Sequence, residues 1–258
     1  MNFGKLSISK LLVIFITFLL GACSSNKRIL IGVYEFSPEH ENKIQHLYHD
    51  TKLEISKYNG RHLGLPFKVI KDLKNEASPA YTEDYSDKIV LISEFKNEEK
   101  LNQYLNSPSV LNAFKEIRIH TIEESLFVAK EFNPLGMMKP TPTIAQRESG
   151  TGQKFLMLNN IEMKSFLNPL TPLRIKRYMD SNFPNLNKNN VKIFTSYEKI
   201  QNIRGNYPFE VMFLTEWQSI ENFENYHLDP EFVKLAKETR NKAFVQFTES
   251  MTQDIELK

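Results

Sequence analysis

The chain has 258 residues, a single cysteine and a nearly balanced charge, with 33 basic and 31 acidic side chains giving a formal net charge of +2. A phosphate backbone is bound by a concentrated basic face, whereas these charges are interleaved along the chain, so no nucleic-acid partner is expected. One cysteine also excludes an internal disulfide, so stability has to come from a hydrophobic core, for which 19 Phe and 10 Tyr are available.

Residues 1–22 are predicted to be a secretory signal peptide. Lys5 and Lys10 come first, an apolar run covers positions 11–20, and small residues follow it. A mature transmembrane helix needs about 20 apolar residues, so this shorter run predicts a segment that is removed. Removal takes away two basic and no acidic residues, which leaves 31 basic (33 − 2) and 31 acidic side chains.

The residues Leu20-Gly21-Ala22-Cys23 resemble the lipobox of bacterial lipoproteins. The resemblance implies cleavage before Cys23, acylation of its thiol and of the new amino group, and a lipid bilayer of the bacterial cell envelope as partner. More than one acyl chain gives stable anchoring, because each buried methylene contributes about 0.8 kcal/mol. Ser24 stands where Asp would indicate inner-membrane retention, so the resemblance implies the outer membrane. An ordinary signal peptide with a chance cysteine is the alternative.

Residues 23–132 are predicted to form a β-α-β-β-α-β unit. The strands are β-branched or apolar runs, and the first helix has a start signal with Ser37 as the cap and Pro38 in the first turn. The expected elements are a strand at 28–34, a helix at 37–58, strands at 67–73 and 89–95, a helical run to residue 118 and a strand at 125–132.

Residues 133–152 are predicted to be a linker, because they hold three Pro and three Gly without apolar periodicity. Residues 153–258 then repeat the order of the first unit. The expected elements are a strand at 154–160, a helix from 171 to about 183, strands at 191–197 and 210–217, a helical run to residue 240 and a strand at 244–249.

The two halves contain segments that are similar to each other at a fixed offset of 122 positions (211 − 89). The run from Ile89 to Arg118 aligns without a gap with the run from Val211 to Arg240, and a fixed offset indicates a duplicated folding unit. The shared residues are Glu94, Glu99, Tyr104, Pro108, Lys115, Glu116 and Arg118, which recur as Glu216, Glu221, Tyr226, Pro230, Lys237, Glu238 and Arg240.

The element order of each half is that of a ferredoxin-like unit, a four-stranded antiparallel sheet with both helices on one face. Both alternating faces of the strand at 89–95 are largely apolar, so the face away from the helices also has to be buried. The predicted fold class is therefore α+β, with two tandem βαββαβ ferredoxin-like units packed sheet to sheet about a pseudo-twofold axis. Since the halves satisfy each other, a monomer is expected.

These features resemble the dimeric α+β barrel superfamily, whose single-unit members pair two subunits in this way. The stretch from Phe213 through Phe232 to Arg240 is similar to the third strand and long helix of the antibiotic-biosynthesis monooxygenase family and its haem-degrading members. The resemblance implies an intramolecular dimeric α+β barrel. It leaves the activity open, because this fold hosts oxygenases, haem enzymes, isomerases and binding proteins.

The haem-degrading members use an Asn on the first strand, a Trp that ends the third strand, and a His on the last helix as the iron ligand. Asn159 and Trp217 fall on the first two positions, but Ala236 stands at the ligand position, as does Phe114 in the other half. Without an axial imidazole, haem binding of that type is not predicted. No other cofactor and no metal site is predicted.

His227 is the main candidate for chemistry. It lies four residues after Phe223, on the helix stripe that faces the sheet, where the first half has Leu105. With Trp217 and Asn159 it would line a pocket between sheet and helix and act as an acid, a base or a ligand-orienting group. The alternative is a partly buried, hydrogen-bonded histidine beside a tryptophan that fills the core.

The duplicated Glu94 and Glu216 also allow two interpretations. If they face each other across the pseudo-twofold axis, they form a carboxylate pair suited to proton transfer. If they belong to the scaffold, their repetition needs no chemistry, and the repetition of flanking Tyr and Pro residues favours this second interpretation.

Two functions from different classes remain open. The first is a lipid-anchored module that holds a small apolar or aromatic ligand, or contacts an envelope partner, without turnover. The second is a cofactor-independent monooxygenase-like enzyme acting on an aromatic or polyketide-like substrate, with His227, Trp217 and Asn159 as its site. A cavity that reaches His227 would favour the enzyme, and solid packing would favour the module. No hydrolase or nucleotide-binding motif is present, and the sequence favours the module.

Overall fold

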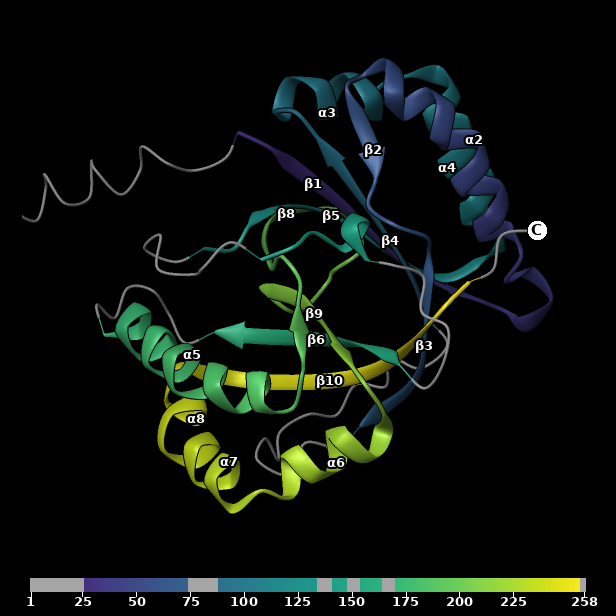
Figure 1. Ribbon diagram of the computed structural model, residues 1–258. Coiled ribbons are helices and arrows are strands. Elements are labelled where there is room, and N and C mark those ends of the chain that lie inside the picture. Colours follow the sequence, from purple (N-terminus) through teal and green to yellow (C-terminus); the bar gives the residue numbers. More distant parts are fainter. Residues whose placement is uncertain (1–25, 74–87, 134–140, 148–153, 164–169, 256–258) are drawn as a thin grey trace, which may run out of the picture.

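Eight strands of the described chain close into a barrel, with helices packed against its outer surface (Figure 1). The computed structural model describes residues 26–73, 88–133, 141–147, 154–163 and 170–255. The predicted mixed α+β class is confirmed. Within these ranges no helix is long and apolar enough to span a membrane. The barrel strands are β1 (Arg28–Phe36), β3 (Phe67–Leu73), β4 (Lys88–Phe95), β5 (Thr121–Glu131), β6 (Phe155–Met163), β8 (Tyr197–Arg204), β9 (Val211–Trp217) and β10 (Phe244–Asp254).

The barrel ring runs β1-β5-β8-β9-β6-β10-β3-β4 and returns from β4 to β1, with antiparallel neighbours throughout. Two ladders, β5 with β8 and β10 with β3, join the two halves of the chain edge to edge. The halves therefore meet through backbone hydrogen bonds as well as through side chains. Each of these eight strands has a neighbour on both sides, although the β3–β4 and β8–β9 ladders are short, with two residue pairs each. Two short strands, β2 (Gly60–His62) and β7 (Lys192–Ile193), pair additionally with β4 and β9.

Side chains alternate between the barrel interior and the layer under the helices. On β4, Val90 and Ile92 belong to the interior cluster, whereas Leu91 and Phe95 belong to the cluster under the helices. Both faces of this strand are buried, as the sequence predicts. The interior cluster draws on both halves of the chain and includes Ile31, Phe67, Phe127, Leu158, Phe194, Tyr207 and Leu214.

The helices form two groups, one over each half of the barrel (Figure 1). The first group packs on β1, β4 and β5, and the second packs on β6, β9 and β10. The first group is α2 (Lys43–Lys57), α3 (Glu98–Leu105) and α4 (Pro108–His120), and the second is α5 (Thr171–Lys188), α6 (Ile220–Leu228), α7 (Pro230–Leu235), the π-helical turn η4 (Ala236–Arg240) and α8 (Asn241–Ala243); single 3₁₀ turns are η1 (Pro38–His40) and η3 (Ile144–Gln146).

The sequence predicts that the repeated helical run of each half is one helix. In the structure this run is divided at a proline in both halves. The second helix of each pair begins at a proline, Pro108 in α4 and Pro230 in α7. Proline lacks the amide proton that a continuing helix needs but fits the first turn of a new one. The first helices also begin alike, since the side chains of Asn97 and Ser219 each accept a hydrogen bond from a backbone amide of the first turn.

The strand predicted at 191–197 is wrong. That range holds the two-residue β7 and only the first residue of β8, which runs from Tyr197 to Arg204 and pairs with β5 of the first half. Most residues of β8 are exposed or half-buried, so the sequence lacks the apolar alternation that marks strands covered by helices.

Two helix boundaries also differ from the prediction. The helix expected to end near residue 183 continues through Pro184 to Lys188, and Leu186 beyond the proline is buried in the core of the second half. Burial of an apolar side chain offsets the hydrogen bond that a proline removes. In the first half, Ser37 and Pro38 begin only the 3₁₀ turn η1, and α2 starts at Lys43.

Candidate functional site

His227 joins helix α6 to strand β10. Its Nδ1 lies 3.0 Å from the carbonyl oxygen of Phe223, and its Nε2 lies 2.9 Å from Oε2 of Glu249. A carbonyl oxygen only accepts, so Nδ1 carries the proton and donates it, and Nε2 faces the carboxylate. The side chains of His227 and Glu249 are 19% and 8% exposed. The structure thus places His227 between sheet and helix, as predicted, with both ring nitrogens engaged.

Two opposing effects act on the pKa of His227. Burial lowers it, whereas the Glu249 carboxylate raises it through its charge and its hydrogen bond, with a further rise from the Phe223 carbonyl. The rise prevails, so the pKa of His227 lies above its ordinary value of 6.5. The fold therefore favours the imidazolium form, which makes the contact with Glu249 an ion pair.

Aromatic rings cover the imidazole of His227. The distances from its ring centre are 4.1 Å to Phe223, 4.9 Å to Tyr226, 5.0 Å to Phe232 and 6.3 Å to Trp217. These spacings are those of packed rings in a protein core. Of the cavities described below, at His62 and at the barrel mouth, neither has His227 in its wall.

Asn159 and Trp217, the other two predicted site residues, converge on Thr215 rather than on His227. The Asn159 amide donates to Oγ1 of Thr215 at 3.2 Å and to the Met157 carbonyl at 3.1 Å, and the Trp217 indole donates to the same Oγ1 at 3.0 Å. Both side chains are 2% exposed. Trp217 packs near His227, but its indole bonds within β9, and the Asn159 amide bonds within β6 and across to β9.

Arg240 is a buried cation in the same layer, 1% exposed. Its guanidinium carbon lies 4.9 Å from the centre of the Phe247 ring, a cation–π arrangement. Burial raises the pKa of the neighbouring Tyr178 to about 12, although Arg240 acts in the opposite direction. The repeated residue in the first half, Arg118, has a 54% exposed side chain. The second half has therefore buried a charge that the first half leaves in water.

Glu249, Thr215 and Arg240 are not predicted as site residues from the sequence. Thr215 stands two residues before Trp217 and hence on the same face of β9, which was an available signal. Arg240 belongs to the repeat, but its repetition does not distinguish a buried arginine from an exposed one. The contact of Glu249 with His227 spans 22 positions and arises only when β10 packs under α6.

The layer under the first group of helices holds a different histidine, His62 of β2. Its Nδ1 lies 2.9 Å from Oγ of Ser93, its Nε2 lies 3.1 Å from Oγ1 of Thr51, and its ring stacks on Tyr48 at 4.7 Å. Burial, with a smaller effect of the nearby Lys52 charge, lowers the pKa of His62 to about 4. His62 is therefore a neutral imidazole at the edge of a very small cavity of about 10 Å³.

The second half does not fit haem ligation of the kind that the resemblance suggests. Ala236, at the predicted ligand position, is fully buried in the π-helical turn, and Phe114 of the first half is 3% exposed. Neither side chain can coordinate iron. His227, in the same layer, has its Nε2 on Glu249.

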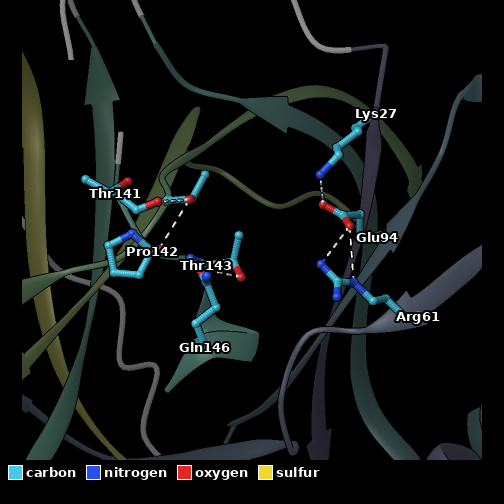
Figure 2. A network of polar contacts seen from close by, with 8 residues as sticks. Lys27, Arg61, Glu94, Thr141, Pro142, Thr143 and Gln146 are labelled. Carbon is cyan, nitrogen blue, oxygen red and sulfur yellow. Dashed lines mark hydrogen bonds and ion pairs between the residues drawn. The ribbon is translucent and has the colours of Figure 1, made fainter. Parts of the chain in front are cut away.

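The duplicated glutamates lie at one mouth of the barrel. Alternate strands of an all-antiparallel ring run in the same direction, and β4 and β9 are such strands, so Glu94 and Glu216 near their ends lie at the same mouth. Each has its own basic partner: Glu94 has Lys27 at 2.9 Å and Arg61 at 3.1 Å (Figure 2), and Glu216 has Arg147 at 2.9 Å. Because buried carboxylates need such partners, the scaffold interpretation fits these contacts.

Residues 141–147 lie at this mouth, where Arg147 pairs with Glu216, and Figure 2 shows Thr141, Pro142, Thr143 and Gln146 of this segment. The Thr195 backbone amide donates to the Pro142 carbonyl at 2.8 Å, which fixes the segment to the chain before β8. The Thr143 amide donates to the Gln146 side chain at 2.7 Å, and Ile144 is 4% exposed within the interior cluster of the barrel. The described part of the range predicted as a linker thus contributes to the core.

No protein-family model matches the sequence, and no curated protein matches it either. Solved structures match by fold. A candidate monooxygenase from Lactobacillus acidophilus NCFM superposes with a TM-score of 0.52 at 11% identity, covering 88% of this chain and 93% of that one. An anthrone oxidase-like protein gives 0.52 at 10% identity, covering 90% and 94%.

A mutant chlorite dismutase from Candidatus Nitrospira defluvii gives a TM-score of 0.52 at 10% identity, covering 93% of this chain and 95% of that one. At such identities the likeness concerns the fold alone. The chain thus shares an α+β barrel fold with these proteins, in line with the mixed α+β class predicted from the sequence.

Proposed function

We propose that this chain is a lipid-anchored lipoprotein of the bacterial cell envelope that binds a small apolar or aromatic molecule without turning it over. Acylated Cys23 would anchor the protein in a lipid bilayer. We propose that this bilayer is the outer membrane rather than the inner membrane. Residues 1–22 would be the cleaved signal. The folded part would be a monomer, because its two halves close one barrel.

Two tandem ferredoxin-like units, 23–132 and 153–258, are proposed to form the barrel. The offset of 122 positions relates β4 to β9 (211 − 89) and Pro108 to Pro230. The strand order is also alike, β5-β1-β4-β3 in one half and β10-β6-β9-β8 in the other. A duplication accounts for both regularities at once.

The observation that carries the non-enzymatic proposal is that the candidate catalytic groups are already engaged within the protein. The two ring nitrogens of His227 bond to the Phe223 carbonyl and the Glu249 carboxylate. The side chains of Asn159 and Trp217 both donate to Thr215. A general acid or base has to reach its substrate with such an atom. Groups that are used in bonds within the sheet, or between a strand and a helix, serve stability first.

Mass spectrometry of the native protein tests the binding proposal. Protein purified from its own host under mild conditions should carry a retained small molecule, released on unfolding as a single species of low mass. Turnover should be absent when that molecule is returned to the purified protein with oxygen. A retained molecule that disappears with the formation of a product would contradict the proposal.

Labelling with radioactive palmitate tests the anchor. The full chain should be labelled in its host, and a Cys23→Ala form should not be labelled. Because no other cysteine is present, continued labelling of the Cys23→Ala form would disprove lipidation at this site without affecting the barrel.

A second candidate, a cofactor-independent monooxygenase-like enzyme with an aromatic or polyketide-like substrate, is favoured by the 19% exposure of the His227 side chain. Above its pKa the neutral ring can accept a proton from an activated carbon. Oxygen consumption with an anthrone as probe tests this candidate. The enzyme candidate predicts that oxygen consumption increases as the pH rises through the His227 pKa and that His227→Gln abolishes it. The binding proposal predicts no oxygen consumption.

A further inference from the structure

The mouth of the barrel at residues 141–147 contains a cavity of about 90 Å³. Its walls are mostly apolar, and two charged side chains complete them. Leu65, Phe67, Ile144 and Leu156 form the apolar part, and Arg147 and Asp254 form the charged part. The cavity therefore combines an apolar interior with one guanidinium group, which is a usual arrangement for recognising a small amphipathic molecule.

Arg147 holds two carboxylates of unequal burial. Its Nε donates to Glu216 at 2.9 Å, and its Nη1 donates to the two oxygens of Asp254 at 2.6 and 2.5 Å. The side chains of Arg147 and Glu216 are 11% and 8% exposed, whereas that of Asp254 is 27% exposed. Removing water from a carboxylate is costly, so Glu216 depends on Arg147, whereas Asp254 can return to solvent at much lower cost.

We propose that this cavity is a binding site for a small apolar carboxylate, whose carboxylate replaces that of Asp254 on Arg147. Asp254 then acts as an internal stand-in for the ligand, and Glu216 keeps the guanidinium in place throughout. Arginine suits this exchange because its donors match a carboxylate in geometry and charge. The inference rests on the proposed function, that the chain binds a small apolar or aromatic molecule, and adds the class of ligand and its place.

The size of the cavity limits the ligand. A volume of about 90 Å³ corresponds to roughly three water molecules at ~30 Å³ each. When the Asp254 carboxylate turns outward, the ligand carboxylate takes its place, so the cavity has to hold only the apolar part of the ligand. The ligand class is therefore a single-ring aromatic acid or a short-chain aliphatic acid, and a fused-ring molecule is too large.

Fluorine NMR with the full-length protein in detergent tests the site, with 4-fluorobenzoate as probe and 4-fluorobenzyl alcohol as its neutral counterpart. The acid should bind at least tenfold more tightly than the alcohol. Asp254→Asn should strengthen acid binding severalfold, because the competing carboxylate is gone. Arg147→Lys should weaken it at least tenfold, because the paired donors are lost while the charge remains.

A matched control is Asp180→Asn, which removes an exposed carboxylate from an ion pair with Lys176 on α5, away from the mouth. It should leave the affinity for the acid unchanged. Circular dichroism and thermal unfolding of each variant show that it is folded. Since Asp254→Asn leaves the buried Glu216–Arg147 pair intact, it is informative even if Arg147→Lys fails to fold.

Three results would overturn the inference: no binding of 4-fluorobenzoate to the wild type and to Asp254→Asn, binding that Asp254→Asn weakens, or binding that neither mouth variant changes. The failure of this site is distinguishable from the failure of the proposed function. If native mass spectrometry finds a retained molecule while the acid does not bind at the mouth, the binding function stands and only the site is wrong.

Discussion

Nε2 of His227 lies 2.9 Å from Oε2 of Glu249, which links helix α6 to strand β10 through one buried ion pair. The corresponding position of the first half holds Leu105, which packs against an apolar cluster. The first half of the chain thus has a leucine where the second half has a histidine paired with a carboxylate.

Replacement of His227 by leucine, the residue of the first half, should destabilise the protein. It leaves Glu249 buried without this cation, and the expected loss in the free energy of unfolding is about 2–4 kcal/mol, toward the low end for a broken buried pair because His227 is partly exposed. Urea unfolding measures it. His46→Leu, on the exposed surface of α2, is the matched control and should change stability by less than about 0.5 kcal/mol. Equal losses in both variants would argue against the pair.

The same ion pair predicts a pH dependence above neutrality. The folded-state pKa of His227 is raised above 6.5, so its contribution to stability is fully present below pH 6.5 and is lost as the pH increases through the folded-state pKa. His227→Gln should lack this loss. The difference in unfolding free energy between wild type and His227→Gln should therefore shrink as the pH increases above 6.5, and a constant difference would contradict the assignment.

His62 should give the opposite pH dependence of stability to His227. Its folded-state pKa of about 4 is below the unfolded value of 6.5, so the unfolded chain binds the proton more readily and stability decreases as the pH falls from 6.5 toward 4. The full effect of such a shift is about 3 kcal/mol. His62→Gln should show a shallower acid decrease than the wild type in pH-dependent urea unfolding. Parallel curves would mean that His62 can be protonated in the folded state.

Ile144 tests whether residues 141–147 belong to the core. Ile144→Ala should reduce the free energy of unfolding by about 2–5 kcal/mol, the range for truncating a buried isoleucine. The control is Leu53→Ala, which shortens a side chain that is 77% exposed on α2 and should have almost no effect. If the two variants behave alike in denaturant unfolding, the segment is a linker after all.

Much of the fold can be predicted from the sequence because its physical signals are local or repeated. The alternation of apolar residues at 89–95 requires two buried faces, and β4 has them. The repeated prolines, by contrast, fall within a single predicted helical run, whereas in the structure Pro108 begins a second helix. β8 is not predicted because its exposed residues, Ile200, Gln201, Asn202 and Ile203, show no apolar alternation. Its pairing with β5 and β9 makes it a strand.

The candidate site could be predicted only in part. The helix period places His227 toward the sheet, but the identity of its partner depends on which residue of β10 comes beneath α6. A lone isoleucine among Pro, Gly and Thr gives no periodic signal, so the burial of Ile144 could not be foreseen. Arg147 and Asp254 are 107 positions apart and form an ion pair only in the folded chain. Such a pair cannot be predicted from the residues around either position.

Native mass spectrometry of three forms purified from the same host, the wild type, Arg147→Lys and His227→Gln, tests most directly whether the chain binds at the barrel mouth rather than under α6. The account predicts that a small carboxylic acid accompanies the wild type and His227→Gln and is missing from Arg147→Lys. A molecule that stays with Arg147→Lys and is missing from His227→Gln would contradict it.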